Sequence, residues 1–222
     1  TISTGSGTVG IGGNIGGTTT TDLAAIKINE TAGTGAITLS GNIGTTSVFG
    51  ATTIEIGNAD TTSLSLDGSF YSSDDAQTYK ADAYSLGGTD PDFASTGDNI
   101  IFHDGGTTTA FVLGNNADLE VNTNLGASAG GNIEFKDNIT IKGIQNNAAQ
   151  DVVLDAGTGS VTVKAIGTST AEINDVTITG TGGIFLRGDI TTMAHTVSSS
   201  EDTGDVTISS AAEINAASVT ID

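Results

Sequence analysis

Cysteine is absent from this chain of 222 residues, and proline occurs once. A disulfide-stapled scaffold is therefore excluded, and 32 glycines beside a single proline exclude collagen. The absence of thiols also fits an exported protein. There is no signal-peptide pattern, and no apolar run approaches the roughly 20 residues that a membrane helix needs. We therefore expect a soluble product of processing, or a fragment, with no membrane partner.

Basic residues are also scarce. Six Lys and Arg stand against 26 acidic residues, which gives a net charge of -20 at pH 7. Nucleic acids and anionic membranes would be repelled by such a chain, so neither is expected as a partner. Most of the acids are Asp, which favours turns over helices. The excess acid is therefore expected on solvent-facing corners.

Short apolar-x-apolar triplets separated by Gly, Thr, Asn or Asp make up most of the chain. Residues 156–163 show the unit: a Gly-Thr-Gly corner leads into Val161-Thr162-Val163. Because side chains alternate across a strand, each triplet places two apolar side chains on one face. No window of 12 or more residues has a helical stripe of apolar residues. The sequence predicts an all-β fold with essentially no helix.

Two pairs of near-identical segments indicate a repeat. Residues 32–39 resemble residues 156–163, which lie 124 positions further on, and Ala-Glu-Ile-Asn at 171–174 returns 41 positions later at 212–215. Both separations fit steps of about 21 residues, within the range of one solenoid coil. We predict a right-handed parallel β-helix, the hand following the crossover rule, as one domain over 1–222. Ten or eleven coils would make a rod roughly 50 Å long.

The least regular stretch is 70–98, which holds all three tyrosines and the only proline. Insertions in solenoids often form loops that bind partners. We expect a loop or lateral protrusion here, with Tyr71, Tyr79 and Tyr84 as partner-binding side chains. The alternative is a long coil whose tyrosines cover the side of the stack.

Acidic pairs offer oxygen ligands of the kind that Ca²⁺ prefers. The candidates are Asp74, Asp75, Asp90 and Asp92, with further acids at 103–104 and 201–205. None follows the spacing of an EF-hand or of the calcium-binding nonapeptide repeat. We therefore expect solvated corners and no metal or cofactor, with Ca²⁺ on the acidic loops as the alternative.

Several motifs together resemble a known family. They are Gly-Thr-Gly-x-Ile/Val-Thr, the Gly-Asn-Ile that recurs at 13–15, 41–43 and 131–133, Ala-Gln-Thr-Tyr at 76–79, and residues 182–192. These are similar to the repeats of filamentous-haemagglutinin-like, very large secreted bacterial adhesins. The resemblance implies a right-handed β-helix exported to the cell surface of a diderm bacterium, working in adhesion or as an extracellular fibre. Host or neighbouring-cell glycans or proteins are then the expected partners.

Arg187-Gly188-Asp189 spells the integrin-binding tripeptide, and it contains the only arginine of the chain. Short motifs match by chance often. Gly188-Asp189-Ile190 also fits the position of the recurring Gly-Asn-Ile. We therefore expect a structural role in the coil rather than a receptor site.

Catalysis on a β-helix would need paired carboxylates with basic or His groups on one face. His103 and His195 lie 92 positions apart, and the six basic residues are thinly spread. We expect no enzyme activity, with a carbohydrate-binding or polysaccharide-cleaving β-helix as the alternative. An ice-binding module is not favoured, because its Thr runs would have to recur once per coil.

The sequence therefore favours a structural or adhesive protein, a segment or subunit of a cell-surface fibre. Strand patterns reach both ends of the chain, at Ile2 and at Val219 and Ile221. An uncovered solenoid end exposes unpaired backbone groups. We expect these three residues to stack end to end on another copy, or on the rest of a longer chain.

Overall fold

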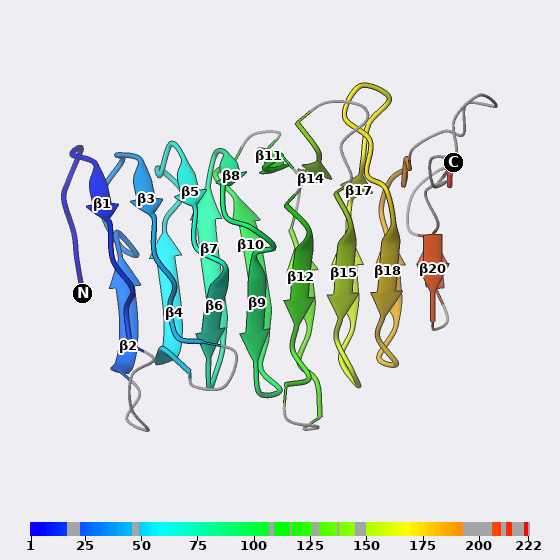
Figure 1. The fold of residues 1–222 in the computed structure, drawn as a ribbon, viewed down its shortest axis with the longest axis horizontal. Coiled ribbons are helices and arrows are strands. Elements are labelled where there is room, and N and C mark those ends of the chain that lie inside the picture. The colour runs from blue at the N-terminus through cyan, green and yellow to red at the C-terminus, as the bar shows by residue number, and fades with distance from the viewer. Residues whose placement is uncertain are drawn as a thin grey trace.

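The computed structural model describes residues 1–16, 23–45, 49–106, 109–115, 117–125, 129–136, 138–144, 150–192, 206–209, 212–214 and 220–221, with the side chains of 213 and 214 left aside. Its strands stack side by side into a parallel β-solenoid (Figure 1), and the described residues form no helix. No helix that could cross a membrane is therefore found in this part of the chain. The predicted all-β parallel solenoid is confirmed, whereas its right hand stays a prediction.

The strands fall into three rows, each formed by hydrogen-bonded parallel neighbours. Row 1 contains β1 (Val9–Ile11), β3 (Ile37–Leu39), β5 (Leu64–Leu66), β8 (Tyr84–Leu86), β11 (Thr109–Leu113), β14 (Ile139–Lys142) and β17 (Ala165–Ile166). Row 2 contains β2 (Leu23–Ile28), β4 (Ala51–Gly57), β7 (Gln77–Ala81), β10 (Ile100–Asp104), β13 (Ile133–Phe135), β16 (Val161–Val163), β19 (Ile184–Leu186) and β21 (Ala212–Ile214). Row 3 contains β6 (Phe70–Ser73), β9 (Asp92–Ser95), β12 (Leu119–Asn122), β15 (Val152–Asp155), β18 (Val176–Thr179) and β20 (Val206–Ile208).

The long strand β4 joins rows 2 and 3. Its first residue, Ala51, pairs with Ser73 of β6, and its second half pairs with β7. From β5 to β19 the chain visits row 1, row 3 and row 2 in turn, so each of these coils contributes three strands. The coil therefore has three sides over this part of the rod.

The coil is longer than the sequence predicted. Neighbouring strands in a row lie about 27 residues apart, and row 1 makes about six turns. The step varies, because Leu64 pairs with Tyr84, 20 positions on, whereas Ile100 pairs with Ile133, 33 positions on. The predicted coils of about 21 residues, ten or eleven in number, are wrong. The strands contain between two and seven residues, and the corners between them also differ in length.

Near-identical segments do not occupy equivalent places. Ile37–Leu39 forms β3 in row 1, whereas Val161–Val163 forms β16 in row 2. What the two segments share is the corner. A Cβ on Gly35 would lie 1.9 Å from the carbonyl oxygen of Gly7, and one on Gly159 would lie 2.0 Å from that of Gly131. The motif thus marks a corner that crosses close above the previous coil, on any row.

The core is one continuous cluster along the rod, from Val9 to Ile190. Aromatic rings fill its middle coils in register. Tyr79 stacks on Phe102 with 5.1 Å between ring centroids, and Phe102 stacks on Phe135 at 4.7 Å. Tyr71 and Phe93 stack in the same way at 4.9 Å. Such pairs add to the stability gained from burial alone.

Residues 70–98 are part of this core and do not protrude. They contain β6, β7, β8 and β9, each paired on both sides. The side chains of Tyr71, Tyr79 and Tyr84 are at most 1% exposed. A side chain buried in this way cannot contact a partner. The interpretation of 70–98 as a lateral loop, and of its tyrosines as partner-binding residues, is therefore wrong.

The buried tyrosine hydroxyls all have hydrogen-bond partners. Tyr71 accepts a bond from the Gly68 N–H at 2.8 Å, Tyr79 donates to Gln77 Oε1 at 2.8 Å, and Tyr84 donates to the His103 carbonyl at 2.6 Å. Burial raises the pKa of each hydroxyl above its usual value. They therefore stay protonated, and the hydrogen-bonding needs of these three hydroxyls are met inside the core.

Candidate functional site

A ladder of Asn side chains links successive coils at the corner that enters row 2. The Oδ1 atom of Asn99 accepts a hydrogen bond from the Asn132 N–H at 2.8 Å, and Asn132 Oδ1 accepts one from the Ser160 N–H at 2.9 Å. We call Asn99 and Asn132 the Asn ladder. Asn14 and Asn42 accept backbone bonds of the same kind at 2.9 and 2.7 Å, on a different corner, which leads to β6 of row 3. Each bond satisfies a backbone donor that the strands do not pair.

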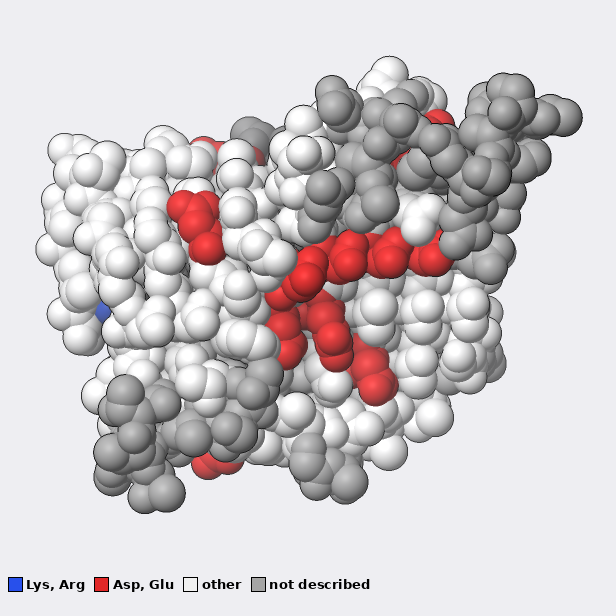
Figure 2. Space-filling model, in the orientation of Figure 1, with Lys and Arg blue, Asp and Glu red and all other residues white. Residues whose placement is uncertain are grey.

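A second ladder, made of Asp, runs along the corner that enters row 3. Asp90 Oδ1 accepts from the Asp118 N–H at 3.3 Å, Asp118 Oδ1 from the Asp151 N–H at 2.8 Å, and Asp151 Oδ1 from the Asp175 N–H at 3.0 Å. We call Asp90, Asp118, Asp151 and Asp175 the Asp ladder. Figure 2 shows acidic side chains gathered in a branched line on the face where β12, β15 and β18 lie in Figure 1.

The Asp ladder brings carboxylates together without basic residues between them. No strand of row 3 contains Lys or Arg over the described residues. Burial raises the pKa of Asp118, and the charges of Asp151 and Asp90 raise it further, against the hydrogen bond from Asp151. Two residues after Asp90 of the ladder, Asp92 on β9 pairs in register with Glu120 on β12. Burial, followed by the charge of Glu120, raises the pKa of Asp92 from 3.8 to about 6.

The Oδ1 atom of Asp92 is buried and has no hydrogen-bond partner. A buried acceptor without a donor disfavours the ionised form, because a charge loses more solvation than a neutral group does. The arrangement therefore favours uptake of a proton on this side of the rod.

The predicted acidic candidates lie in two places. Asp74 and Asp75 are exposed at the corner between β6 and β7, where Asp74 accepts from the Thr96 hydroxyl. Asp90 belongs to the Asp ladder, and Asp92 begins β9 beside it. In the part of the chain that is described, no three acidic or His side chains converge in a way that would hold a metal ion. Ca²⁺ binding stays a prediction, and the acids at 201–205 lie outside the described residues.

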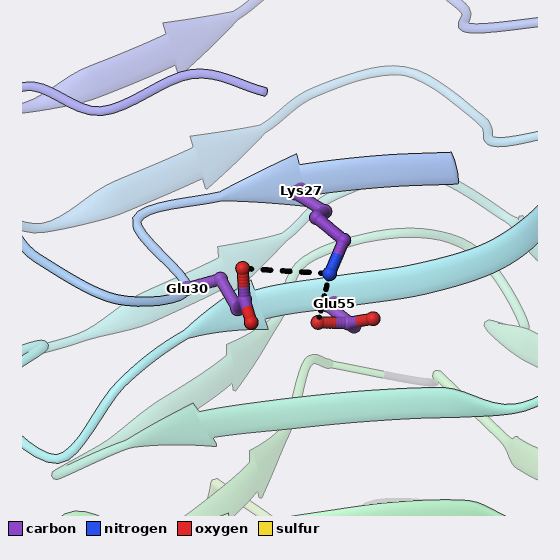
Figure 3. A network of polar contacts seen from close by, with 3 residues as sticks. All are labelled: Lys27, Glu30 and Glu55. Carbon is purple, nitrogen blue, oxygen red and sulfur yellow. Dashed lines mark hydrogen bonds and ion pairs between the residues drawn. The ribbon is translucent and has the colours of Figure 1, made fainter. Parts of the chain in front are cut away.

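Row 2 carries a separate charged group around Lys27 (Figure 3). Its ammonium lies 2.8 Å from Glu55 Oε2 and 3.5 Å from Glu30 Oε2. The hydrogen bond to Glu55 raises the pKa of Lys27, so this lysine stays a cation. Both glutamates line a shallow hollow of about 270 Å³ that Lys80 and His103 also line. The hollow combines two carboxylates with basic groups, which the thin spread of basic residues along the sequence did not predict.

Arg187-Gly188-Asp189 lies on the corner after β19. The Arg187 N–H donates to the Val163 carbonyl at 2.9 Å, and Asp189 Oδ1 accepts from the Thr220 N–H at 2.9 Å. Asp189 thus links two coils as Asn14 and Asn42 do. The structural role that the sequence predicted for Asp189 is confirmed.

The N-terminal end of the rod is apolar. Ile2 is 42% exposed and Leu23 46% exposed, beside a hollow of about 180 Å³ that Ile11 and Ile15 also line. Near the other end, Ile221 is 49% exposed. Val219 lies outside the described residues. Ile2 and Ile221 therefore have the exposure that end-to-end stacking requires.

No protein-family model, curated protein or solved structure matches this chain.

The Asp ladder was missed from the sequence, although a signal was present. Asp118, Asp151 and Asp175 each stand directly before an apolar-x-apolar triplet. The separations between them differ, so no fixed period aligns them. The Asn residues of the recurring Gly-Asn-Ile suit hydrogen-bonded ladders between coils, and in the structure their side-chain oxygens accept backbone N–H groups of the next coil.

Proposed function

We propose that this protein is a structural or adhesive β-solenoid segment, or subunit, of an extracellular fibre at a cell surface, and that it has no catalytic activity. The observation that carries the proposal is the apolar N-terminal end of the rod. β1 pairs only with β3 among the described strands. β2 pairs with β4 and makes a single bridge to Ile2, whose side chain is exposed.

Backbone groups on the outer side of β1 are available to a further strand. In a solenoid each coil completes the hydrogen bonds of its neighbour, and exposed apolar strand edges tend to pair. The occupant that matches this edge is another coil of parallel β-structure. It is supplied either by more of the same chain or by a second copy stacked end to end.

Electron microscopy of the purified chain tests the stacking. Rods much longer than one chain support it, and uniformly short particles at high protein concentration overturn it. Leu23→Asp places a charge at the apolar end and should shorten the rods. Ile144→Asp is the matched control, because Ile144 is 53% exposed on the corner after β14, away from that end.

The charge of -20 per chain makes a second test possible. Fibres of this charge repel each other, and screening shortens the range of repulsion to roughly 3 Å at 1 M salt. Lateral bundles should therefore form on adding salt or divalent cations and disperse on dilution or chelation. Bundles unaffected by ionic strength and by chelator would contradict this part of the proposal.

The adhesive part of the proposal has host or neighbouring-cell glycans or proteins as partners and a location outside the cell. The absence of cysteine and the repeat-rich sequence support export. Fluorescently labelled rods should bind to whole cells, and enzymatic removal of surface glycans separates glycan from protein partners. If the rods bind no cell surface, the adhesive part of the proposal is wrong and the protein is a purely structural fibre.

A carbohydrate-binding or polysaccharide-cleaving protein is the second candidate. It is favoured by the hollow that brings Glu30, Glu55, Lys80 and His103 together. Release of reducing ends from a panel of polysaccharides tests it. Activity lost in Glu55→Gln but kept in Glu120→Gln, an exposed acid on row 3, would establish it in place of the structural proposal.

A further inference from the structure

The Asp ladder sets row 3 apart from the rest of the rod. Asp118 and Asp151 each accept a backbone hydrogen bond from the next coil, so their position is fixed by the stacking. Coils in a parallel stack lie about 4.8 Å apart. Consecutive carboxylates of the ladder are therefore held near one another for as long as the coils stay paired.

Among the described residues, the charged side chains on and beside the strands packed against β12 at Asp118 are acidic. Asp90 precedes β9 on one side, Asp151 precedes β15 on the other, and Glu120 follows on β12 itself. Asp92 on β9 lies beside Glu120, and Asp175 continues the line before β18. The neutral amide of Asn174 donates a hydrogen bond to Asp151 Oδ1 at 2.9 Å.

The Asn ladder shows that the backbone bond itself needs no charge. Asn132 accepts the Ser160 N–H at 2.9 Å, as Asp118 accepts the Asp151 N–H at 2.8 Å. A protonated Asp keeps a carbonyl oxygen that can accept the same bond. Protonation therefore removes repulsion between coils without removing the hydrogen bond.

We propose that the row 3 side of the rod is a proton-responsive device: mildly acidic conditions strengthen the stacking of the coils from β9 to β18, and neutral pH weakens it. The device acts on the strength of the stack and is separate from the stacking at the ends of the rod.

The direction of the pH effect follows from the linkage between proton binding and folding. Asp92 and Asp118 have pKa values raised in the folded state, so the folded chain holds protons that the unfolded chain has released. Their contribution to stability is full below the ordinary value of 3.8 and is lost as pH rises to about 6 for Asp92. This is opposite to ordinary acid denaturation, in which carboxylates with lowered pKa values lose their partners.

The central experiment is thermal unfolding of Asp118→Asn and of the unchanged chain at pH 4.5 and pH 7.5, with a chelator present. Asn keeps the acceptor for the Asp151 N–H and removes the charge. We expect Asp118→Asn to raise the Tm by about 2–4 °C at pH 7.5 and by much less at pH 4.5. Equal shifts at the two pH values, or none, would overturn the proposal.

Asp60→Asn is the matched control. Asp60 is exposed on the corner between β4 and β5, so the change removes the same net charge away from the Asp ladder. If its Tm at pH 7.5 rises as much as that of Asp118→Asn, the effect belongs to overall charge, and the proposal fails.

The double variant Asn99→Asp with Asn132→Asp tests the same idea in the opposite direction and is independent of whether ladder variants at Asp118 fold. It places two consecutive carboxylates, one coil apart, in the Asn ladder. We expect a lower Tm at pH 7.5 that recovers at pH 4.5. A carbon NMR titration of the unchanged chain adds a direct measurement, and an Asp118 carboxyl that titrates at or below its ordinary value would contradict the mechanism.

Discussion

The Asn ladder and the Asp ladder accept the same kind of backbone hydrogen bond at two different corners of the coil. Asn132 and Asp118 both receive the N–H of a residue one coil later, at 2.9 and 2.8 Å. They differ in charge, and only the acidic ladder has carboxylates as neighbours on both sides. One corner of the rod is therefore indifferent to pH, whereas the other is stabilised by protons.

This difference explains why Asn is favoured over Asp at a corner that stacks on the next coil. An amide supplies the acceptor and leaves the electrostatic energy of the stack unchanged, whereas a carboxylate accepts more strongly but repels its copies above and below. A long fibre of Asp ladders would accumulate repulsion with every coil. The Asp ladder of this chain is limited to a few coils, and Asn occupies comparable corners elsewhere.

The largest expected effect comes from Phe102→Ala, which removes the buried ring between Tyr79 and Phe135 in the core. Truncation of a buried Phe typically costs about 3–5 kcal/mol. Chemical denaturation should give the same loss at pH 4.5 and pH 7.5, because the ring stack contains no ionised group. A loss that depends on pH would show that core packing and ladder charge are coupled and would break the comparison.

A smaller effect is expected from removing the side-chain acceptor of each ladder, and its size should differ between the two ladders. Asn132→Ala leaves the half-buried Ser160 N–H without its partner, which should cost about 1 kcal/mol, the lower end of the range for a fully buried donor. Asp118→Ala loses the bond to the Asp151 N–H but also relieves repulsion. Unfolding in urea at pH 7.5 should therefore show the larger loss for Asn132→Ala. Equal losses would mean that charge contributes nothing to the ladder.

Asp92→Asn measures how much an ionised carboxylate beside the Asp ladder destabilises the fold. Its pKa of about 6 in place of 3.8 means that the ionised form is unfavourable in the fold. Allowing for its partial exposure, the change should stabilise the chain by about 1–2 kcal/mol at pH 7.5. The gain should fall away between pH 6 and pH 4, and a pH series of urea midpoints measures it. A gain that persists at pH 4 would point to packing instead.

The smallest effect is expected on row 2, at the ion pairs of Lys27 that Figure 3 shows. Lys27→Met leaves Glu30 and Glu55 without their ammonium. Exposed pairs contribute little and are screened by salt. The Tm should drop slightly at low salt and match the unchanged chain at 1 M NaCl. A drop that survives high salt would indicate that the lysine stem matters through packing.

Some features of the site were visible in the sequence and others were not. The recurring Gly-Asn-Ile indicated a repeated corner, and Asp189 was assigned to that corner correctly. Asp118, Asp151 and Asp175 look like ordinary corner acids until the coils are stacked, because their separations along the chain differ. The charged hollow at Glu55 and His103 joins residues of different coils in the same way.

The sequence by itself determined the type of strand and the type of fold. Alternating apolar residues can bury only one side of a strand, and short strands without helices leave a parallel solenoid as the stable solution. The period of the coil was decided in three dimensions. Corners of different length close at little extra cost in entropy, so strands stay in register while their spacing in sequence varies.

Tertiary structure also decided which side chains face inward. Tyr71, Tyr79 and Tyr84 stand in a stretch rich in Asp that resembles a loop, yet packing on Phe93, Phe102 and Phe111 buries them. Rings one coil apart meet only when the register is set. The same is true of the Asp ladder, because repulsion between carboxylates depends on their distance in space and not along the chain.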